Sequence, residues 1–352
     1  MKTGTDASVV QVSPDVDPLE YCYQQGWTDG LPVVPPTAER VKAMLATVDR
    51  APAEVLGVFL PVGAEITVEK VAINAVLAGC LPEYFPVVLT AVECMAEREG
   101  SMGGLLTTIH GDTPLMILNG PVVKALDFNA GNNTFGPGWR ANATVGRAIA
   151  LLMRNVAAGE PGGFDMATQT HPGKYTYCIA EFEEASPWPP YHVEQGFAVG
   201  ESVVTVVGAQ GPRHVVDMAS TTAKGVLTTL ADAIAVIGTY NTYRGGEIVM
   251  VLSPTHARII AGDGWSREDV KYFVFDKARR RLGELRHIGY YNIGGTMYWP
   301  PWIDTEDDDT LVPTVLRPQD VKIVVAGGEV GGYSSIVFCF GMPATTRAIP
   351  SV

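Results

Sequence analysis

Short apolar segments alternate with longer helical segments, and this order constrains the fold more than any other feature of the chain. The apolar segments that predict strands are 55–60, 115–118, 202–207, 248–252 and 321–326. Strands that lack polar alternation are buried on both faces, which requires helices that cover the sheets they form. The sequence therefore predicts an α/β protein.

The order of these segments also predicts a diverged internal duplication. In each copy a strand precedes a helix that opens with threonine, which is Thr67 in the first copy and Thr221 in the second. A second strand then precedes another helix, over 142–155 in the first copy and over 267–280 in the second. We expect two similar βαβα lobes, joined by a long connecting segment and completed by a C-terminal closing strand. Chance likeness between two ordinary βαβα units is the alternative.

The predicted organisation has five parts. They are an N-terminal arm and extended loop (1–54), a first α/β lobe (55–160), a connecting segment (161–200), a second α/β lobe (201–300) and a C-terminal closing segment (301–352). A chain of 352 residues is long enough to form two such lobes or one large domain.

Composition and charge exclude several classes of protein. Hydrophobic residues make up 47% of the chain, which predicts a folded core, and the net charge of −13 argues against a nucleic-acid partner. The N-terminal segment lacks the apolar core of a signal peptide, and no apolar run has the roughly 18 residues of a membrane span. We therefore expect a cytoplasmic protein without a membrane partner. Its five cysteines form no CxxC pair, which predicts free thiols.

The segment GWTDGLPVVPPT, residues 26–37, predicts a stiff, extended loop. Its glycines and prolines remove backbone donors and fix dihedral angles, so regular structure is excluded. Such a loop would hold Trp27 and Asp29 in defined directions, and we expect both to bind the substrate. Thr37 should cap the short helix that follows, through residue 45.

Cys80 lies between two predicted helices, over 68–78 and from residue 82 onward. Pro82 suits the first position of a helix, which would place Cys80 where free backbone N–H groups and the helix dipole favour a thiolate. Glu83 would raise the pKa of the thiol if it lies close. The alternative is a small, buried residue at a tight corner.

The loop over 128–142 leads directly into a helix and predicts an anion-binding site. Asn132 and Asn133 offer hydrogen-bond donors and acceptors, and Arg140 can pair with a carboxylate or phosphate. Long irregular loops in compact domains are usually functional. The alternative is an ordered surface loop that Asn142 caps.

The segment HPGKYTYCIAE, residues 171–181, predicts a short strand with two distinct faces. Tyr177 and Glu181 share one face, whereas Cys178 lies on the other and should be packed. His171 and Lys174 lie at the start of the strand, where they could reach a substrate, and Tyr177 is a candidate for substrate binding.

The sequence has no local pattern for a metal or a serine nucleophile. There is no HExxH, HxH or Cys/His cluster, and the GxSxG motif is absent. We therefore predict no metal-binding residue and name no cofactor. A metal site assembled from distant histidines and carboxylates, including Glu181 and Asp112, stays open as an alternative.

Four blocks of sequence resemble a broad bacterial family of uncharacterised proteins. They are GWTDGLPVVPPT (26–37), AGCLPEYFPVVLTAVE (78–93), FGPGWRANATVGRA (135–148) and HPGKYTYCIAE (171–181). Proteins of this family resemble partners of a small protein with a UGSC motif, in which selenocysteine or cysteine is reactive. This chain has neither UGSC nor CGSC. The resemblance implies thiol chemistry and a small thiol or selenol partner protein, and it ranks Cys80 first among the cysteines.

These features favour a cysteine-dependent enzyme that acts on a small, carboxylate-bearing organic molecule. Cys80 would be the thiolate nucleophile or redox group, Lys174 and Arg140 would bind the anion, and His110 or His171 would move protons. The reaction class stays open among a lyase, a reductive cleavage and a hydrolysis.

Two alternative functions stay open. Assembly of the chain into a homo-oligomer also stays open. One of the two functions is a metal-dependent hydrolase or lyase. The other is a non-catalytic subunit of a heteromeric enzyme, whose aromatic segments 290–302 and 333–340 would contact the partner if they are exposed.

Overall fold

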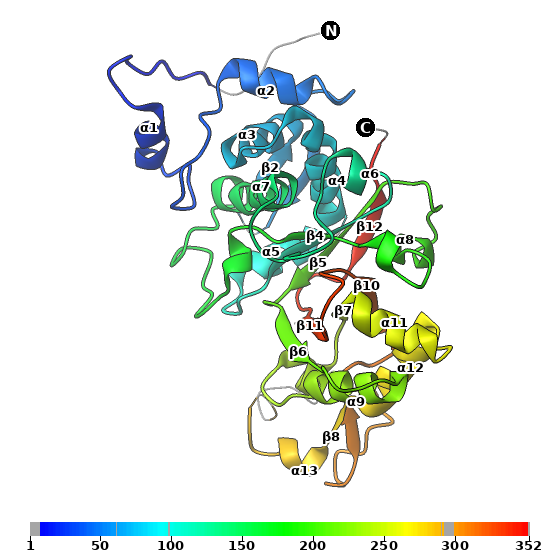
Figure 1. The fold of residues 1–352 in the computed structure, drawn as a ribbon. Helices are drawn as coiled ribbons and strands as arrows, with labels where there is room; N and C mark the ends of the chain where they lie inside the picture. Colours follow the sequence, from blue (N-terminus) through cyan, green and yellow to red (C-terminus); the bar gives the residue numbers. More distant parts are fainter. Residues whose placement is uncertain (1–7, 61, 98, 290, 292–298, 351–352) are drawn as a thin grey trace.

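Two four-stranded sheets pack face to face, and helices cover the outer face of each sheet (Figure 1). This computed structural model describes residues 8–60, 62–97, 99–289, 291 and 299–350. The layers follow the order helices, sheet, sheet, helices, so both sheets are buried on both faces. The coarse prediction of an α/β protein is therefore confirmed.

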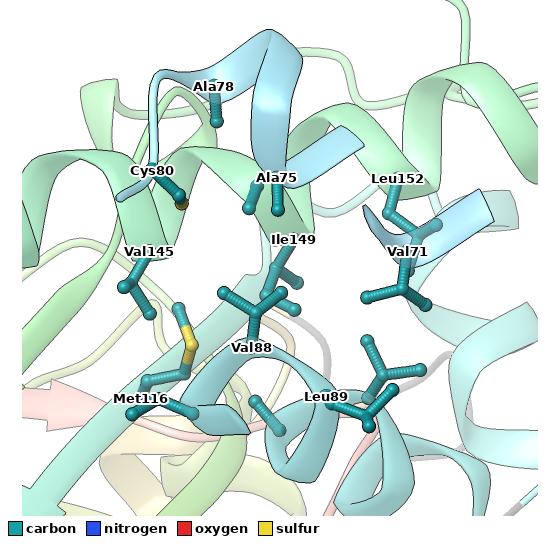
Figure 2. Packing of buried hydrophobic residues seen from close by; sticks show 14 of the residues in the cluster. Val71, Ala75, Ala78, Cys80, Val88, Leu89, Met116, Val145, Ile149 and Leu152 are labelled. Atoms are coloured by element: carbon teal, nitrogen blue, oxygen red, sulfur yellow. The ribbon is translucent and has the colours of Figure 1, made fainter. Parts of the chain in front are cut away.

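The first sheet has the strand order β12-β5-β3-β4, in which β3 and β4 are parallel and the other pairs are antiparallel. Its strands are β12 (Thr345–Ala348), β5 (Val203–Ala209), β3 (Thr113–Asn119) and β4 (Cys178–Ala180). Its outer face is covered by α3 (Val68–Ala78), α4 (Phe85–Ala96) and α7 (Arg140–Val156). Figure 2 shows this packing, with Val71 of α3, Leu89 of α4 and Ile149 of α7 directed toward one another.

The second sheet has the order β10-β7-β11-β6, in which β10 and β7 are parallel and the other pairs are antiparallel. Its strands are β10 (Val321–Val325), β7 (Ile248–Leu252), β11 (Tyr333–Phe338) and β6 (Arg213–Val216). Its outer face is covered by α9 (Ala223–Ile234), α11 (Pro254–Gly262) and α12 (Arg267–Lys277). The two sheets have the same pattern of strand pairs. Starting from β12 in the first sheet and from β6 in the second, two antiparallel pairs are followed by one parallel pair.

Alternation along the strands divides each one between two cores. Leu115 and Ile117 of β3 lie in the core between the sheets, together with Val249 and Val251 of β7. The residue between the first two, Met116, belongs to the helical core on the outer side. Because successive side chains of a strand point to opposite faces, a continuous apolar strand is what this layered arrangement requires.

Two strands pass from one sheet into the other. The chain of β5 continues into β6 of the second sheet, and the chain of β11 continues into β12 of the first. The two crossing segments meet at an antiparallel bridge between Ala209 and Cys339. On either side, the amide of Gln210 donates to Phe338 O at 2.9 Å, and the amide of Phe340 donates to Gly208 O at 3.0 Å. This strand exchange ties the two sheets together.

The remaining elements surround this framework. The helices are α1 (Pro18–Gln24), α2 (Ala38–Leu45), α5 (Glu99–Thr107), α6 (Val122–Ala125), α8 (Tyr191–Glu194), α10 (Tyr240–Arg244) and α13 (Leu282–Leu285). The strands form two small antiparallel pairs, β1 (Val55–Phe59) with β2 (Ala64–Thr67), and β8 (Arg279–Arg281) with β9 (Leu311–Pro313). Within the described residues, no helix is long and apolar enough to cross a membrane.

The pairing of the strands differs from the predicted division of the chain. The sequence predicts residues 55–60 in the first lobe, but β1 pairs with β2, outside the main sheets. It predicts the strand over 202–207 in the second lobe, yet β5 pairs with β3 in the first sheet. The connecting segment supplies β4, and the closing segment supplies β10, β11 and β12. Each sheet is therefore assembled from segments that are distant in the sequence.

The local signals for helix starts are mostly confirmed. The side chains of Thr37 and Thr67 accept hydrogen bonds from the amides of Arg40 and Lys70, as N-caps do. At α9 the N-cap is Thr222 rather than Thr221, with its side chain bonded to an amide in the first turn.

Candidate functional site

The chain segments that precede β3, β4 and β7 meet where the two strands cross between the sheets. The loop before β3 carries His110 and Asp112, and the loop before β4 carries His171. The helix α10 precedes β7, and Phe340 lies within one of the crossing segments. Four of the predicted site residues, His110, His171, Lys174 and Tyr177, therefore lie in one region of the protein.

His110 and Asp112 form a hydrogen-bonded pair at the start of β3. Nδ1 of His110 bonds to Oδ2 of Asp112. The carboxylate is fully buried, whereas the imidazole is 23% exposed. Nε2 of His110 has no hydrogen-bond partner among the described residues. The carboxylate thus fixes one edge of the ring and leaves the other edge available.

Two aromatic rings and a guanidinium surround this imidazole. The ring of His110 meets that of Tyr240 edge to face at 4.6 Å, and it lies 5.5 Å from the ring of Phe340. Tyr240 and Phe340 stack on each other at 4.6 Å. The guanidinium of Arg244 lies over both rings, 5.7 and 5.5 Å from their centres. A positive charge therefore lies on the same aromatic pair as the imidazole.

His171 is a second imidazole beside Asp112. Nδ1 of His171 accepts a hydrogen bond from the amide of Gly173, and its ring packs against Tyr177 at 5.4 Å. Burial lowers the pKa of His171, and the charge of Asp112 and the nearby carbonyl of Ala209 oppose this effect without offsetting it. Nε2 of His171 is buried and forms no hydrogen bond of normal geometry with the described residues. This imidazole is therefore held in its neutral form.

Lys174 and Tyr177 have partners within the chain. Nζ of Lys174 binds both carboxylate oxygens of Asp165, at 2.8 and 2.6 Å. The buried hydroxyl of Tyr177 donates to Gln210 O at 2.9 Å, and burial raises its pKa well above the usual value. Lys174 fixes the segment before β4, and Tyr177 fixes the strand crossing. Neither side chain presents its charge or hydroxyl to a substrate in this arrangement.

The expected lowered pKa of Cys80 is wrong. Gly79 ends α3 in the left-handed conformation, with φ of 90°, and the amide of Cys80 donates to Ala75 O. Cys80 therefore belongs to the carboxyl end of α3 rather than to the start of the next helix, and the dipole disfavours a thiolate there. Figure 2 shows Cys80 among apolar side chains such as Val145. Burial raises the pKa of the Cys80 thiol to about 12, although Thr144 and Arg140 act in the opposite direction.

Arg140 satisfies the end of α3. Its Nε and Nη2 both donate to Gly79 O, at 3.1 and 2.9 Å. The guanidinium thus compensates a carbonyl that the helix leaves without a partner. This contact accounts for Arg140 without a bound anion.

The asparagines of the loop before α7 shape the loop itself. Asn133 adopts φ of 65°, and its side-chain amide donates to Pro137 O at 2.8 Å. Asn132 lies against Gly328, which follows β10, so it connects the loop to the second sheet. Asn142 does not cap the helix, because α7 begins at Arg140, and its side chain instead binds both the amide and the carbonyl of Asn129.

Asp29 and Trp27 hold the extended loop to the helical layer. Both oxygens of Asp29 bind Arg147 of α7, at 2.9 and 2.7 Å. Burial alone would raise the pKa of Asp29, but hydrogen bonds and the charge of Arg147 lower it overall. Trp27 is half-buried, and its carbonyl accepts a hydrogen bond from Asn155. Asp29 is therefore paired, whereas Trp27 lines a cavity on the outer side of α3 and α7.

A buried ion pair joins the two halves of the protein at the opposite ends of β3 and β4. Glu181 is fully buried and binds Arg267 of α12, the side-chain amide of Asn119 and the backbone amide of Tyr191. A cavity of about 640 Å³ lies beside this network. The cationic side chains on its wall are already paired with carboxylates. Arg267 and Lys271 bind Glu194, and Lys322 binds Glu247. We interpret the network as a structural joint.

No group of three or more His, Cys, Asp and Glu side chains among the described residues is arranged to hold a metal ion. The distant ligands of the metal-dependent alternative, Glu181 and Asp112, instead have the separate partners given above.

Tyr240, Phe340 and Arg244 were not identified as site residues from the sequence. Phe340 lies in an apolar run that resembles a buried strand, and the segment around Tyr240 carries no motif. The spacing of His110 and Asp112, with one glycine between them, was the available signal for the imidazole–carboxylate pair.

No protein-family model matches this chain, and no curated protein matches it. The resemblance of the blocks 26–37, 78–93, 135–148 and 171–181 to a bacterial family therefore stays a prediction.

The burial of His171 predicts a specific pH dependence of stability. The unfolded chain binds a proton at His171 near pH 6.5, and the folded chain does so only at lower pH. The contribution of neutral His171 to the free energy of unfolding is therefore complete above pH 6.5. It is lost as the pH falls from 6.5 toward the pKa of His171 in the folded chain. In urea unfolding, the free-energy difference between wild type and His171→Asn should shrink between pH 7.5 and pH 5. A difference that is constant or grows would contradict the assignment, and measurements above pH 7.5 serve as the baseline.

The described cysteines should react slowly in the folded protein. All five are buried, and burial raises the pKa of each one. At pH 8 we expect iodoacetamide to alkylate Cys80 at least about a hundredfold more slowly than a free thiol. Peptide mass spectrometry resolves the individual rates, and the same measurement in 6 M guanidinium is the control, in which all five should react alike. Fast, selective alkylation of folded Cys80 would restore it as a nucleophile.

Proposed function

We propose that this protein is an enzyme that transfers a proton to or from a small, carboxylate-bearing organic molecule, with His110 as the acid–base group. The observation that carries the proposal is the bond from His110 Nδ1 to the fully buried carboxylate of Asp112. The same pairing of imidazole and carboxylate supports proton transfer in many unrelated enzymes.

Asp112 acts on His110 as a positioning residue. A carboxylate that accepts the Nδ1 proton favours the tautomer with an unprotonated Nε2, which is the form that removes a proton. The same charge stabilises the imidazolium after the transfer. Because Asp112 is fully buried, this interaction is little screened by water.

Arg244 supplies the charge that a carboxylate-bearing substrate needs. Its guanidinium and the His110 ring lie against the same two aromatic side chains, Tyr240 and Phe340. Abstraction of a proton next to a carboxylate leaves negative charge on the substrate, and a nearby cation stabilises that charge. The positive charge and the base thus lie against the same aromatic pair.

We propose an internal duplication as the origin of this site, with a correspondence of strands that differs from the predicted one: β5 corresponds to β11 rather than to residues 55–60. The last pair of the parallel ladder is Leu118 with Ala180 in the first sheet and Leu252 with Val325 in the second. If Leu118 and Leu252 correspond, counting back eight residues from each leads to positions 110 and 244. His110 and Arg244 would then occupy equivalent positions in the two halves.

The crossing strands agree with this correspondence. Ile117 pairs with Thr205, and Val251 pairs with Ser335, which makes Thr205 and Ser335 equivalent. Counting four residues onward from each of these leads to Ala209 and Cys339, which form a bridge with each other. A pair of equivalent residues in mutual contact marks an approximate twofold axis. The proposed site lies beside that axis.

Acid–base chemistry is favoured over the cysteine-dependent mechanism by the burial of the thiols. The thiolate is the reactive form, and a pKa of about 12 leaves almost none of it at Cys80 near neutral pH. Of the three reaction classes, a lyase needs proton transfer and no co-reactant, whereas a hydrolysis also consumes water and a reductive cleavage consumes a reductant; we therefore propose the lyase. A small thiol or selenol partner protein stays a prediction from the resemblance.

The non-catalytic subunit receives less support. Residues 334–339 are buried, with Tyr333 exposed at one end, so this segment offers no extended apolar surface. The other proposed interface, 290–302, lies largely outside the described residues. Of its described tryptophans, Trp299 is buried and Trp302 is exposed.

Deuterium exchange tests the proposal with a panel of candidate substrates. The protein is incubated in D₂O with small 2-oxo, 3-oxo and 3-hydroxy carboxylic acids. At a substrate carbon next to a carbonyl or carboxyl group, the C–H bond breaks, its electron pair stays on the substrate and the proton binds Nε2 of His110. Return of a deuteron gives a C–D bond that mass spectrometry detects. We expect His110→Gln to slow exchange by at least about a hundredfold.

Two further variants distinguish the roles of the residues. Asp112→Asn should also slow exchange, whereas Cys80→Ser should leave it unchanged. Circular dichroism and thermal unfolding verify that each variant is folded. Exchange that survives His110→Gln, or that requires Cys80, would contradict the proposal, as would an absence of catalysed exchange across the panel.

A further inference from the structure

A second cavity, of about 730 Å³, lies on the outer side of the first helical layer. Its walls come from residues 8–12, α1, the extended loop over 26–37, the start of α2, α3 and the end of α7. None of the acid–base site residues lines it. Its volume lies within the range of cavities that hold small-molecule ligands.

Apolar side chains form most of its wall. Ile73 and Leu77 of α3, Trp27 of the extended loop and Tyr21 of α1 all line the cavity. The rings of Tyr21 and Trp27 meet edge to face, with 5.9 Å between their centres. A cavity with aromatic and branched aliphatic walls suits a flat, apolar body.

The polar part of this wall includes the side chains of two asparagines, Asn74 and Asn155. The side-chain amide of Asn155 donates to Asn74 Oδ1 at 2.8 Å, and that of Asn74 donates to Lys70 O at 2.9 Å. Asn74 is only 3% exposed, so its orientation is fixed by these bonds. Asn155 Oδ1 receives no hydrogen bond from the part of the chain that the structure describes. It can therefore accept one from a ligand.

The charged residues on the wall are one carboxylate and one ammonium. Glu69 and Lys70 are neighbours on α3, and Nζ of Lys70 donates to Glu65 O at 2.7 Å. Their charges are opposite, so the wall has no net charge from these side chains. An ion would gain little there for the hydration it loses, which favours an uncharged ligand.

We propose that this cavity binds a small, uncharged, ring-containing molecule with one hydrogen-bond donor, which Asn155 Oδ1 accepts. The ring would pack between Trp27 and Ile73. Such a ligand differs in charge from the substrate of the proposed acid–base site, and the inference does not depend on that function. In this proposal Trp27 binds a ligand, as we expect from the extended loop, but in a cavity separate from the acid–base site.

Indole is a suitable probe, and benzothiophene is its matched partner, with the same shape and no N–H donor. Isothermal titration calorimetry on the full chain should show saturable binding of indole at one site. Benzothiophene should bind several-fold more weakly because it cannot donate to Asn155 Oδ1. This comparison uses the wild-type protein, so it does not depend on the folding of any variant.

Ile73→Trp tests the location, because the larger side chain fills the cavity. We expect this substitution to weaken indole binding at least tenfold, whereas Ile237→Trp, at a position that is 41% exposed and outside the cavity, should leave it unchanged. Thermal unfolding verifies that both variants are folded. An absence of saturable binding, equal affinity for the two probes, or binding that survives Ile73→Trp would overturn the proposal.

Discussion

The exchange of strands between the two sheets is the constraint on which the rest of the structure depends. A strand that leaves one sheet and completes the other cannot move without disturbing both, and the contact between Ala209 and Cys339 holds the two crossings together. The apolar faces of both sheets are thereby brought into one shared core. Helices bury the outer face of each sheet, and the shared core buries the inner face, which explains why the strands are apolar throughout.

The crossing also positions the proposed site. The loops before β3, β4 and β7 all end at the edge of the sheets where the strands exchange, so residues far apart in the sequence become neighbours there. His110 arrives from the first half, Arg244 from the second, and Phe340 from the crossing segment itself. An imidazole and a guanidinium from the two halves of the chain thus lie against the same aromatic side chain, Phe340.

Local features of the fold could be predicted from the sequence, whereas long-range pairing could not. The predicted strand over 248–252 coincides with β7, and Thr37 caps α2, because period, capping and apolar runs are local properties. The pairing of β5 with β3 joins residues whose separation no local pattern reveals. The same limit applies to the site: sequence placed His110 and His171 among the candidates but gave no reason for their proximity to Phe340. The expected pKa of Cys80 was wrong for a similar reason: a short 3-10 helix does begin at Pro82, but Gly79 ends α3 just before Cys80, and burial of the thiol, which raises its pKa, depends on distant residues.

The central claim is that Asp112 holds His110 as a base with a free Nε2. Two-bond ¹H–¹⁵N correlation spectra of the imidazole rings, recorded at a pH where His110 is neutral, report directly which nitrogen carries the proton. We predict a protonated Nδ1 and an unprotonated Nε2 in the wild-type protein, and a shift toward the other tautomer in Asp112→Asn. A wild-type His110 that carries its proton on Nε2 would contradict the account, because that nitrogen could not then accept a proton from a substrate.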